Sequence, residues 1–453
     1  MPHWIRSTLL LVALLIAATA APAQEIAPTP PMGWNSWDAY GWTIDEPQFR
    51  AAATELVKLH PYGWTYAMID QGWYMDKPLG TNLQDRHYFL DAHGLLIPAP
   101  THFPSSVDGQ GFKPLADWLH AQGLKFGIHI IRGIPKDAVT ANLPIAGTSF
   151  HASDAADTAD TCPWDDGTYG VRDNAAGQAY YDSMLALYAQ WGVDFVKADC
   201  ISDRPYKISE IRQLQAAIKK TGRPIVLSLS PGPTNPSHAA EVRQYAEMWR
   251  ISNDVWDGWS FAHKPNEDWP VGLRDIFDRL PLWAGQAHDG RWPDADMLPF
   301  GMLVPHPGVG EPRKSRLTLE EERTQFTLLA IARSPLILGA NLTKLDNVTR
   351  QLITNKDVIA VNQASHDNLP VSNLPPGFEH VRVWVASGEA GQRYLAVFNL
   401  DDKPVSLQAS WDKLGLAAGQ HTARDLWKSH RLAASDQLKL VLPAHGCVLY
   451  AVQ

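Results

Sequence analysis

Two charged side chains stand inside a run of residues that otherwise has the pattern of a buried strand. The run is VDFVKADC, residues 193–200, and in an extended strand Phe195, Lys197 and Asp199 share one face. Placing a lysine and an aspartate in an apolar interior costs several kcal/mol per ion unless they are paired or solvated. Two interpretations are therefore open: a structural ion pair, or two side chains that face a solvated pocket.

Other polar residues occupy the same kind of position, at the end of a short apolar run. They are Trp37 and Asp38, Asp70 and Gln71, His129, Ser230, Arg250 and Asp254, and Asp296. In a parallel barrel the carboxyl ends of the strands meet at one rim, where catalytic groups lie. Aspartates from several strands that converge with a lysine and an arginine are hard to explain structurally, so this set favours the pocket.

Converging carboxylates serve two kinds of enzyme chemistry. A metal enzyme would bind Mg²⁺ or Zn²⁺ through them, but the chain lacks HxH, HExxH and paired-cysteine spacing, so we expect no metal and no cofactor. Glycoside hydrolysis instead needs one ionised carboxylate below the anomeric carbon and one protonated acid at the leaving oxygen. Lys197 near Asp199 would favour the ionised carboxylate, because an opposite charge lowers its pKa.

A repeated unit would position these residues: an amphipathic helix, a glycine and a short apolar strand. It occurs around Gly63, Gly123, Gly192 and Gly222, and MGWNSW, EMWRISND, DADMLPF and SPLILGA are further strand candidates. About eight strands alternating with helices over roughly 330 residues predict a (β/α)8 barrel. The alternative, a doubly wound open sheet, lacks a GxGxxG or P-loop glycine pattern.

The character of the chain changes towards its C-terminus. We expect the barrel over residues 24–366, a proline-rich linker over 367–378 and a small antiparallel β-sandwich over 379–453, where short apolar runs alternate with turns.

The N-terminus has the features of a secretory signal peptide. Arg6 is followed by an apolar run and by the small-residue site Ala21-Pro22-Ala23, so we expect cleavage after Ala23 and a secreted or periplasmic protein. The net charge of −9 argues against a nucleic acid partner, and no later run is long enough for a membrane span. Oligomeric state, and periplasm versus medium, stay open.

Seven motifs, in order, resemble glycoside hydrolase family 27, the α-galactosidases and their relatives. They are TPPMGWNSWDAYG (29–41), YAMIDQGW (66–73), LKFGI (124–128), VKADC (196–200), WRISNDVWDGW (249–259), WPDADML (292–298) and RSPLILGANL…NKDVIAVNQ (333–363). The resemblance covers nearly the whole barrel. It implies an enzyme that acts on an oligosaccharide or polysaccharide.

The resemblance also implies roles for individual residues. Asp199 would be the nucleophile and Asp254 the acid/base, with Arg250 on the 2-hydroxyl side of the sugar. The implied substrate-binding residues are Trp37, Asp70, Gln71, His129, Lys197, Ser230, Arg250, Asp296 and Met297. For Trp37 and Met297, plain core packing is the alternative.

Three positions depart from the family pattern. Two adjacent aspartates usually follow the second strand, where this chain has Asp70-Gln71; a tyrosine is replaced by His129, and a glutamate by Ser230. We expect a retaining exo-acting glycosidase, with α-galactoside as the first candidate substrate. The alternatives are a β-L-arabinopyranosidase, an isomaltose-releasing dextranase, or a non-catalytic carbohydrate-binding barrel.

The three cysteines suggest one disulfide if the protein is exported. Cys200 directly follows the proposed nucleophile, and Cys162 lies in a long loop of roughly residues 136–176 between two neighbouring strands. Family members often bridge these positions, so we expect a Cys162–Cys200 disulfide and a free Cys447. The alternative is two separate buried thiols.

Overall fold

The computed structural model describes residues 25–76, 87–263, 268–304 and 311–453. The predicted signal peptide therefore lies outside the described residues.

Eight parallel strands form the main sheet, in the order β10-β9-β8-β7-β3-β2-β1-β13. Their bounds are β1 (Met32–Asn35), β2 (Tyr66–Ile69), β3 (Lys125–Ile131), β7 (Phe195–Asp199), β8 (Val226–Leu229), β9 (Met248–Arg250), β10 (Trp292–Asp294) and β13 (Leu336–Leu338). An isolated parallel bridge pairs Leu298, four residues after β10, with Leu338 of β13. The predicted barrel is confirmed, and the open sheet is excluded.

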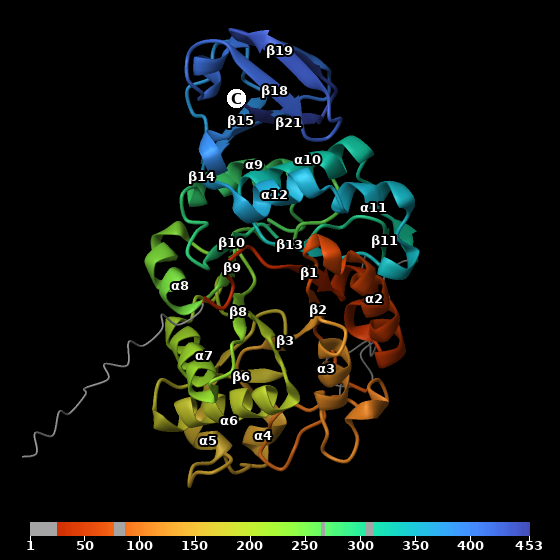
Figure 1. The fold of residues 1–453 in the computed structure, drawn as a ribbon. Helices are drawn as coiled ribbons and strands as arrows, with labels where there is room; N and C mark the ends of the chain where they lie inside the picture. Colours follow the sequence, from red (N-terminus) through yellow and green to blue (C-terminus); the bar gives the residue numbers. More distant parts are fainter. Residues whose placement is uncertain (1–24, 77–86, 264–267, 305–310) are drawn as a thin grey trace, which may run out of the picture.

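The barrel helices lie outside the strands (Figure 1). They are α1 (Trp37–Tyr40), α2 (Glu46–Leu59), α3 (Lys113–His120), α6 (Ala175–Trp191), α7 (Ile208–Thr221), α8 (Ala239–Tyr245), α9 (Leu273–Arg279), α10 (Leu319–Ile331), α11 (Asn347–Ile353) and α12 (Lys356–Ala364). Gly192 ends α6 with a positive φ of 86°. Glycine adopts this left-handed conformation without steric cost, so the chain can turn directly into β7.

The seventh barrel strand lies earlier than the sequence analysis placed it. DADMLPF, residues 294–300, was the expected strand, but β10 ends at Asp294. The Asp294 side chain accepts a hydrogen bond from the backbone N–H of Asp296 (2.9 Å), and Asp296 has a φ of +75°. The chain turns at Asp296, two residues after the end of β10, so Asp296 lies beyond the strand.

The interior of the barrel changes from apolar to polar along the strands. Phe195 at the start of β7 is buried in a cluster with Tyr66, Met68 and Trp292. Further along the same face of β7, Lys197 and Asp199 are only partly buried. The strand therefore has one apolar half, which fills the barrel, and one charged half, which reaches a pocket.

The segment expected to be a long loop after β3 is a small folded unit. It contains α4 (Lys136–Thr140), α5 (Ala152–Ala155) and a three-stranded sheet of β4 (Ile134–Pro135), β6 (Thr168–Val171) and β5 (Ala156–Thr161). The predicted disulfide is confirmed: Cys162 is bonded to Cys200, with 6.0 Å between their Cα atoms, and Cys447 is free and buried. The disulfide attaches this unit to the end of β7.

The C-terminal domain is the predicted antiparallel sandwich. A six-stranded sheet has the order β14-β15-β16-β21-β18-β19, and β17 pairs with β20. The strands are β14 (His366–Pro370), β15 (Val381–Ser387), β16 (Arg393–Asn399), β17 (Val405–Ser410), β18 (His421–Asp425), β19 (Arg431–Ser435), β20 (Gln437–Leu442) and β21 (Cys447–Val452). The sheet starts at His366, the last residue of the expected barrel, and β14 continues through the first residues of the expected linker.

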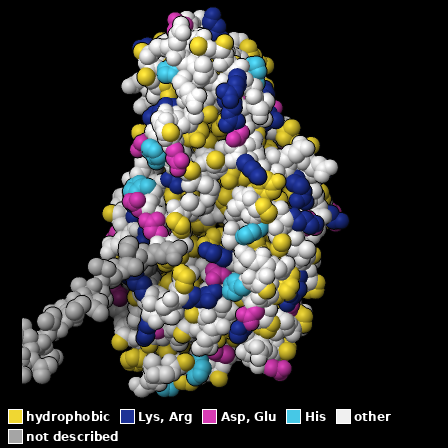
Figure 2. Space-filling model, viewed as in Figure 1, with side chains coloured by type: hydrophobic (Ala, Val, Ile, Leu, Met, Phe, Trp, Pro, Cys, Tyr) yellow, Lys and Arg dark blue, Asp and Glu magenta, His cyan; other side chains and the backbone are white. Residues whose placement is uncertain are grey.

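The sandwich lies over α9, α10 and α12 of the barrel (Figure 1). Lys and Arg side chains are mixed with Asp and Glu on the face drawn in Figure 2. A short hairpin of β11 (Met302–Leu303) and β12 (Arg313–Lys314) completes the sheets. Within the described ranges, no helix has both the length and the apolar character needed to cross a membrane.

Candidate active site

A pocket of about 620 Å³ opens where the barrel strands end. Ten of the predicted site residues line it: Trp37, Asp70, Gln71, His129, Lys197, Asp199, Ser230, Asp254, Asp296 and Met297. Arg250 is buried behind this lining and bonds to two of its carboxylates. The structure thus brings together residues that are up to 260 positions apart in the sequence (37 to 297).

Asp199 is held as an ionised carboxylate at the end of β7. His129 Nε2 lies 3.3 Å from its Oδ2, and the backbone N–H of Cys200 donates to its Oδ1 (2.7 Å). Burial alone would raise the pKa of Asp199, but His129, Lys197 and the Cys200 N–H together hold that pKa below its ordinary value. A carboxylate in this state can act as a nucleophile.

Lys197 forms its direct ion pair with Asp70 rather than with Asp199. Its Nζ lies 2.9 Å from Asp70 Oδ2, which also accepts a hydrogen bond from Asn35 Nδ2 (2.7 Å). Burial would raise the pKa of Asp70, but Lys197 and His129 lower it well below its usual range. Lys197 was expected to be the charge beside Asp199, but His129 is the closer partner of Asp199 (3.3 Å).

Arg250 forms ion pairs with two further carboxylates of the pocket, Asp254 and Asp296. Its guanidinium lies 3.2 Å from Asp254 Oδ1 and 2.8 Å from Asp296 Oδ2. The Asp254 side chain is 44% exposed, whereas Asp296 is buried. Burial raises the pKa of Asp296 although the Arg250 charge lowers it, and the nearby Asp254 charge raises it further. Asp254 is therefore the more accessible of these two lining carboxylates.

For Trp37 and Met297, core packing and a place in the pocket lining were alternatives, and the structure shows both. Both belong to the apolar cluster of the barrel interior, and both line the pocket. Ser230 lines the pocket as well, and its backbone N–H donates to Ala198 O (2.8 Å).

Asp38 lines the pocket, although the sequence analysis gave it no role. Among the described residues, its Oδ2 is buried without a hydrogen-bond partner. Burial and the Asp296 charge raise the pKa of Asp38 well above its ordinary value. Its position at a strand end was visible in the sequence, but its protonation depends on neighbours from other strands.

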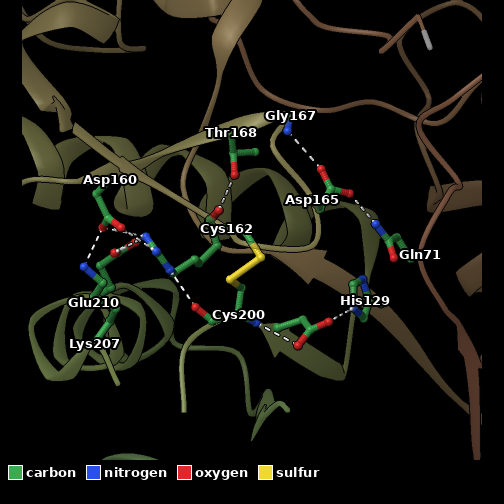
Figure 3. The surroundings of a disulfide bond; sticks show 12 residues. Gln71, His129, Asp160, Cys162, Asp165, Gly167, Thr168, Cys200, Lys207 and Glu210 are labelled. Carbon is green, nitrogen blue, oxygen red and sulfur yellow. Dashed lines mark hydrogen bonds and ion pairs between the residues drawn. A yellow bond between two sulfur atoms is a disulfide. The ribbon is translucent and has the colours of Figure 1, made fainter. Parts of the chain in front are cut away.

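Asp165 is a second residue that the sequence analysis missed. Its Oδ2 accepts a hydrogen bond from Gln71 Nε2 (2.5 Å), across a separation of 94 residues. Figure 3 shows this pair beside the disulfide and His129. No local spacing marks Asp165, because the contact depends on how the folded unit after β3 packs against β2.

Two exposed tryptophans stand among the lining residues. Trp164 is 44% exposed and Trp269 is 48% exposed. Asn253, next to Asp254, donates to Asp268 (3.1 Å), so the chain preceding Trp269 is tied to the Asp254 side of the pocket. Exposed aromatic faces beside a pocket suit contact with a sugar ring.

In the part of the chain that the structure describes, no group of three or more His, Cys, Asp or Glu side chains is placed to hold a metal ion.

Known proteins resemble this chain over both domains. Residues 162–364 match the family model described as alpha galactosidase A, and residues 379–452 match its C-terminal beta sandwich domain. The crystal structure of a family 27 β-L-arabinopyranosidase from Geobacillus stearothermophilus is 40% identical, with a TM-score of 0.87, and the match covers 94% of this chain and 97% of that one. The chain belongs to glycoside hydrolase family 27.

More distant relatives have other printed activities. Alpha-galactosidase A of Cellvibrio japonicus is 27% identical over 97% of this chain and 96% of its own length. The structure of α-galactosidase I from Mortierella vinacea is 25% identical, with a TM-score of 0.72, and the match covers 94% of this chain and 97% of that one. The protein is thus an α-galactosidase-like glycoside hydrolase, and a carbohydrate is its substrate.

Proposed function

We propose that this family 27 enzyme is a retaining, exo-acting glycosidase that removes a terminal α-galactosyl residue. The main support for the proposal is that one pocket contains two carboxylates in different environments. Asp199 is held ionised by His129, and Asp254 is half-exposed beside Arg250. Double displacement needs this division between a nucleophile and an acid/base.

The first half of the reaction forms a covalent intermediate. An oxygen of Asp199 attacks the anomeric carbon, while Asp254 donates its proton to the glycosidic oxygen and the leaving group departs. In the second half, Asp254 takes a proton from water, the water attacks the anomeric carbon, and the bond to Asp199 breaks. The two inversions together retain the configuration.

The burial of one part of the pocket lining supports an exo mode of action. Asp70, Gln71 and His129 are buried lining residues that present hydrogen-bonding groups. Such a buried lining accepts the terminal ring of a chain. The half-exposed Asp254 and Trp269 lie towards solvent, where the leaving group would remain.

Two sugars fit this proposal. α-Galactose is favoured by the printed names of the curated relatives. β-L-Arabinopyranose has the same ring configuration without the hydroxymethyl group, and the 40%-identical neighbour is named for it. Gln71 replaces the second of the two adjacent aspartates of the family pattern, and the loss of this charged hydroxyl contact favours the second candidate.

A panel of nitrophenyl glycosides tests the proposal. We expect hydrolysis of the α-galactoside or the β-L-arabinopyranoside, and little hydrolysis of the α-glucoside or the isomaltoside. Asp199→Asn should abolish turnover. Asp254→Asn should lose least on nitrophenyl substrates, because a good leaving group needs little protonation. Preference for the α-glucoside, or full activity of Asp199→Asn, would contradict the proposal.

We further propose export of the protein, on the basis of the predicted leader and of the disulfide. Mass spectrometry of the exported protein should find an N-terminus after Ala23. An intact leader on the mature protein would contradict this.

A further inference from the structure

Gln71 lies between the substrate pocket and a carboxylate that stands behind it. Its side chain lines the pocket and is 7% exposed. Behind it, Asp165 is 3% exposed, and the distance from Gln71 Nε2 to Asp165 Oδ2 is 2.5 Å. Asp165 therefore reaches the pocket through Gln71.

The chemistry of this contact determines which way the Gln71 amide faces. A carboxylate can only accept hydrogen bonds, whereas an amide has one donor end and one acceptor end. The NH₂ group of Gln71 must therefore point to Asp165. The oxygen of the amide points away from Asp165 in Figure 3. With its NH₂ group directed at Asp165, Gln71 turns its oxygen, an acceptor, away from Asp165.

Asp165 is itself fixed from both sides along the chain. Three residues before it, Cys162 is bonded to Cys200, and two residues after it, the N–H of Gly167 donates to Asp165 Oδ1 (2.9 Å). Gly167 O also accepts from Lys136 N (3.0 Å). Both oxygens of the carboxylate thus have donors, and its position follows that of the folded unit after β3.

We propose that Asp165 is a positioning residue for substrate recognition, which holds the Gln71 amide so that only its oxygen faces the sugar. The proposal rests on the proposed glycosidase function of the same pocket. Lys197, whose Nζ donates to Asp70 Oδ2 (2.9 Å), also lines the pocket and can donate to a hydroxyl there. A sugar hydroxyl can accept from such a donor while it donates to the Gln71 oxygen, so an acceptor at this position completes its hydrogen bonding.

The variant Asp165→Asn separates this role from simple packing. Its side-chain oxygen would accept from the Gly167 N–H, as Asp165 Oδ1 does, so its NH₂ would face Gln71. Two donor groups cannot pair, and the Gln71 amide would have to turn its NH₂ towards the pocket. We expect kcat/KM to fall roughly tenfold, as for the loss of a hydrogen bond to substrate, with an unchanged melting temperature.

The paired change Gln71→Glu with Asp165→Asn should rescue this loss. The asparagine NH₂ then donates to one glutamate oxygen, and the other oxygen faces the sugar as an acceptor. Gln71→Glu alone would place two carboxylates against each other, so it should be less active than the double variant at neutral pH. Asp166→Asn is the matched control, because its side chain is 62% exposed and pairs only loosely with Lys136 (3.6 Å).

The rates are measured on the glycoside that the wild-type enzyme cleaves fastest, so a wrong sugar in the proposed function does not affect the comparison. Loss in Asp165→Asn, recovery in the double variant and wild-type behaviour of Asp166→Asn support the inference. The inference is overturned if Asp165→Asn matches Asp166→Asn, or if the double variant is no better than Asp165→Asn. A wild-type protein that hydrolyses nothing in the panel would overturn the proposed function and the inference together.

Discussion

His129 controls the charge of the proposed nucleophile. Its Nε2 bonds the Asp199 carboxylate, and a hydrogen bond to the charged form lowers a pKa. In His129→Phe the pKa of Asp199 should rise, so the carboxylate becomes protonated at a higher pH. Since only the ionised form attacks, the acid limb of the kcat/KM profile should move to higher pH.

The measurement is kcat/KM against pH on a nitrophenyl substrate. His60→Phe is the control, because His60 is exposed and does not line the pocket. An acid limb that stays in place in His129→Phe would show that His129 does not set the ionisation of Asp199.

Pocket residues could be predicted from the sequence where they stand at the end of an apolar strand. Ten predicted residues line the pocket because parallel strands bring their carboxyl ends to one rim. The pairing of Lys197 with Asp70 was not predictable, because it depends on which strands are neighbours across the barrel. Asp165 gave no signal at all, since it reaches Gln71 from a separate folded unit.

At the scale of elements, the disulfide attaches the unit after β3 to the end of β7. Closing a separation of 38 residues should stabilise the fold by roughly 3–4 kcal/mol in the chain-entropy estimate. Replacing both Cys162 and Cys200 by serine should lower the free energy of unfolding by about that amount and weaken activity through Asp165. Thiol counting on the denatured, unreduced wild type should find one free thiol, and three would reject the bridge.

The segment with Trp269 should contact the leaving group rather than the sugar that is cleaved off. Its neighbour Asp268 is tied to Asn253, directly beside Asp254. Trp269→Ala should lower kcat/KM on an oligosaccharide several-fold, in line with the loss of one aromatic stacking contact. A glycosyl fluoride has no leaving-group ring, so its kcat/KM should be unchanged.

Equal losses on the oligosaccharide and the fluoride would place Trp269 in the binding of the terminal sugar instead. Trp164→Ala is the comparison variant, because Trp164 is similarly exposed but lies on the disulfide-linked unit.

The order of helices and strands could be predicted from the sequence, because the spacing of apolar residues distinguishes helices from strands and glycines mark the helix ends. The seventh strand was misplaced because the apolar residues of DADMLPF (294–300) are typical of a short strand. The strand instead ends before a turn at Asp296, where the Asp294 side chain accepts a hydrogen bond from the Asp296 N–H. The sheet inside the 136–176 segment was missed because β5 is largely polar and exposed. Its partners are supplied by the fold and not by an apolar pattern.

In the whole molecule, the barrel and the sandwich share a polar contact at the buried side chain of Thr327. Thr327 Oγ1 on α10 accepts from Trp427 Nε1 (2.9 Å) and lies 3.3 Å from the Cys447 thiol. Thr327→Val keeps the volume but leaves the indole N–H without its acceptor. We expect a loss of about 1–3 kcal/mol in the free energy of unfolding, measured by denaturant titration. Thr54→Val, on an exposed position of α2, is the control, and equal stability of the two variants would contradict the role of this contact.

The central claim is that Asp199 and Asp254 carry out a double displacement. Proton NMR of the first product, followed from the start of hydrolysis of the best glycoside in the panel, tests it most directly. Double displacement predicts that the first anomer to appear has the configuration of the substrate, and that the other anomer forms only by mutarotation. If the inverted anomer appears first, a water and not Asp199 attacks the anomeric carbon, and the account is wrong.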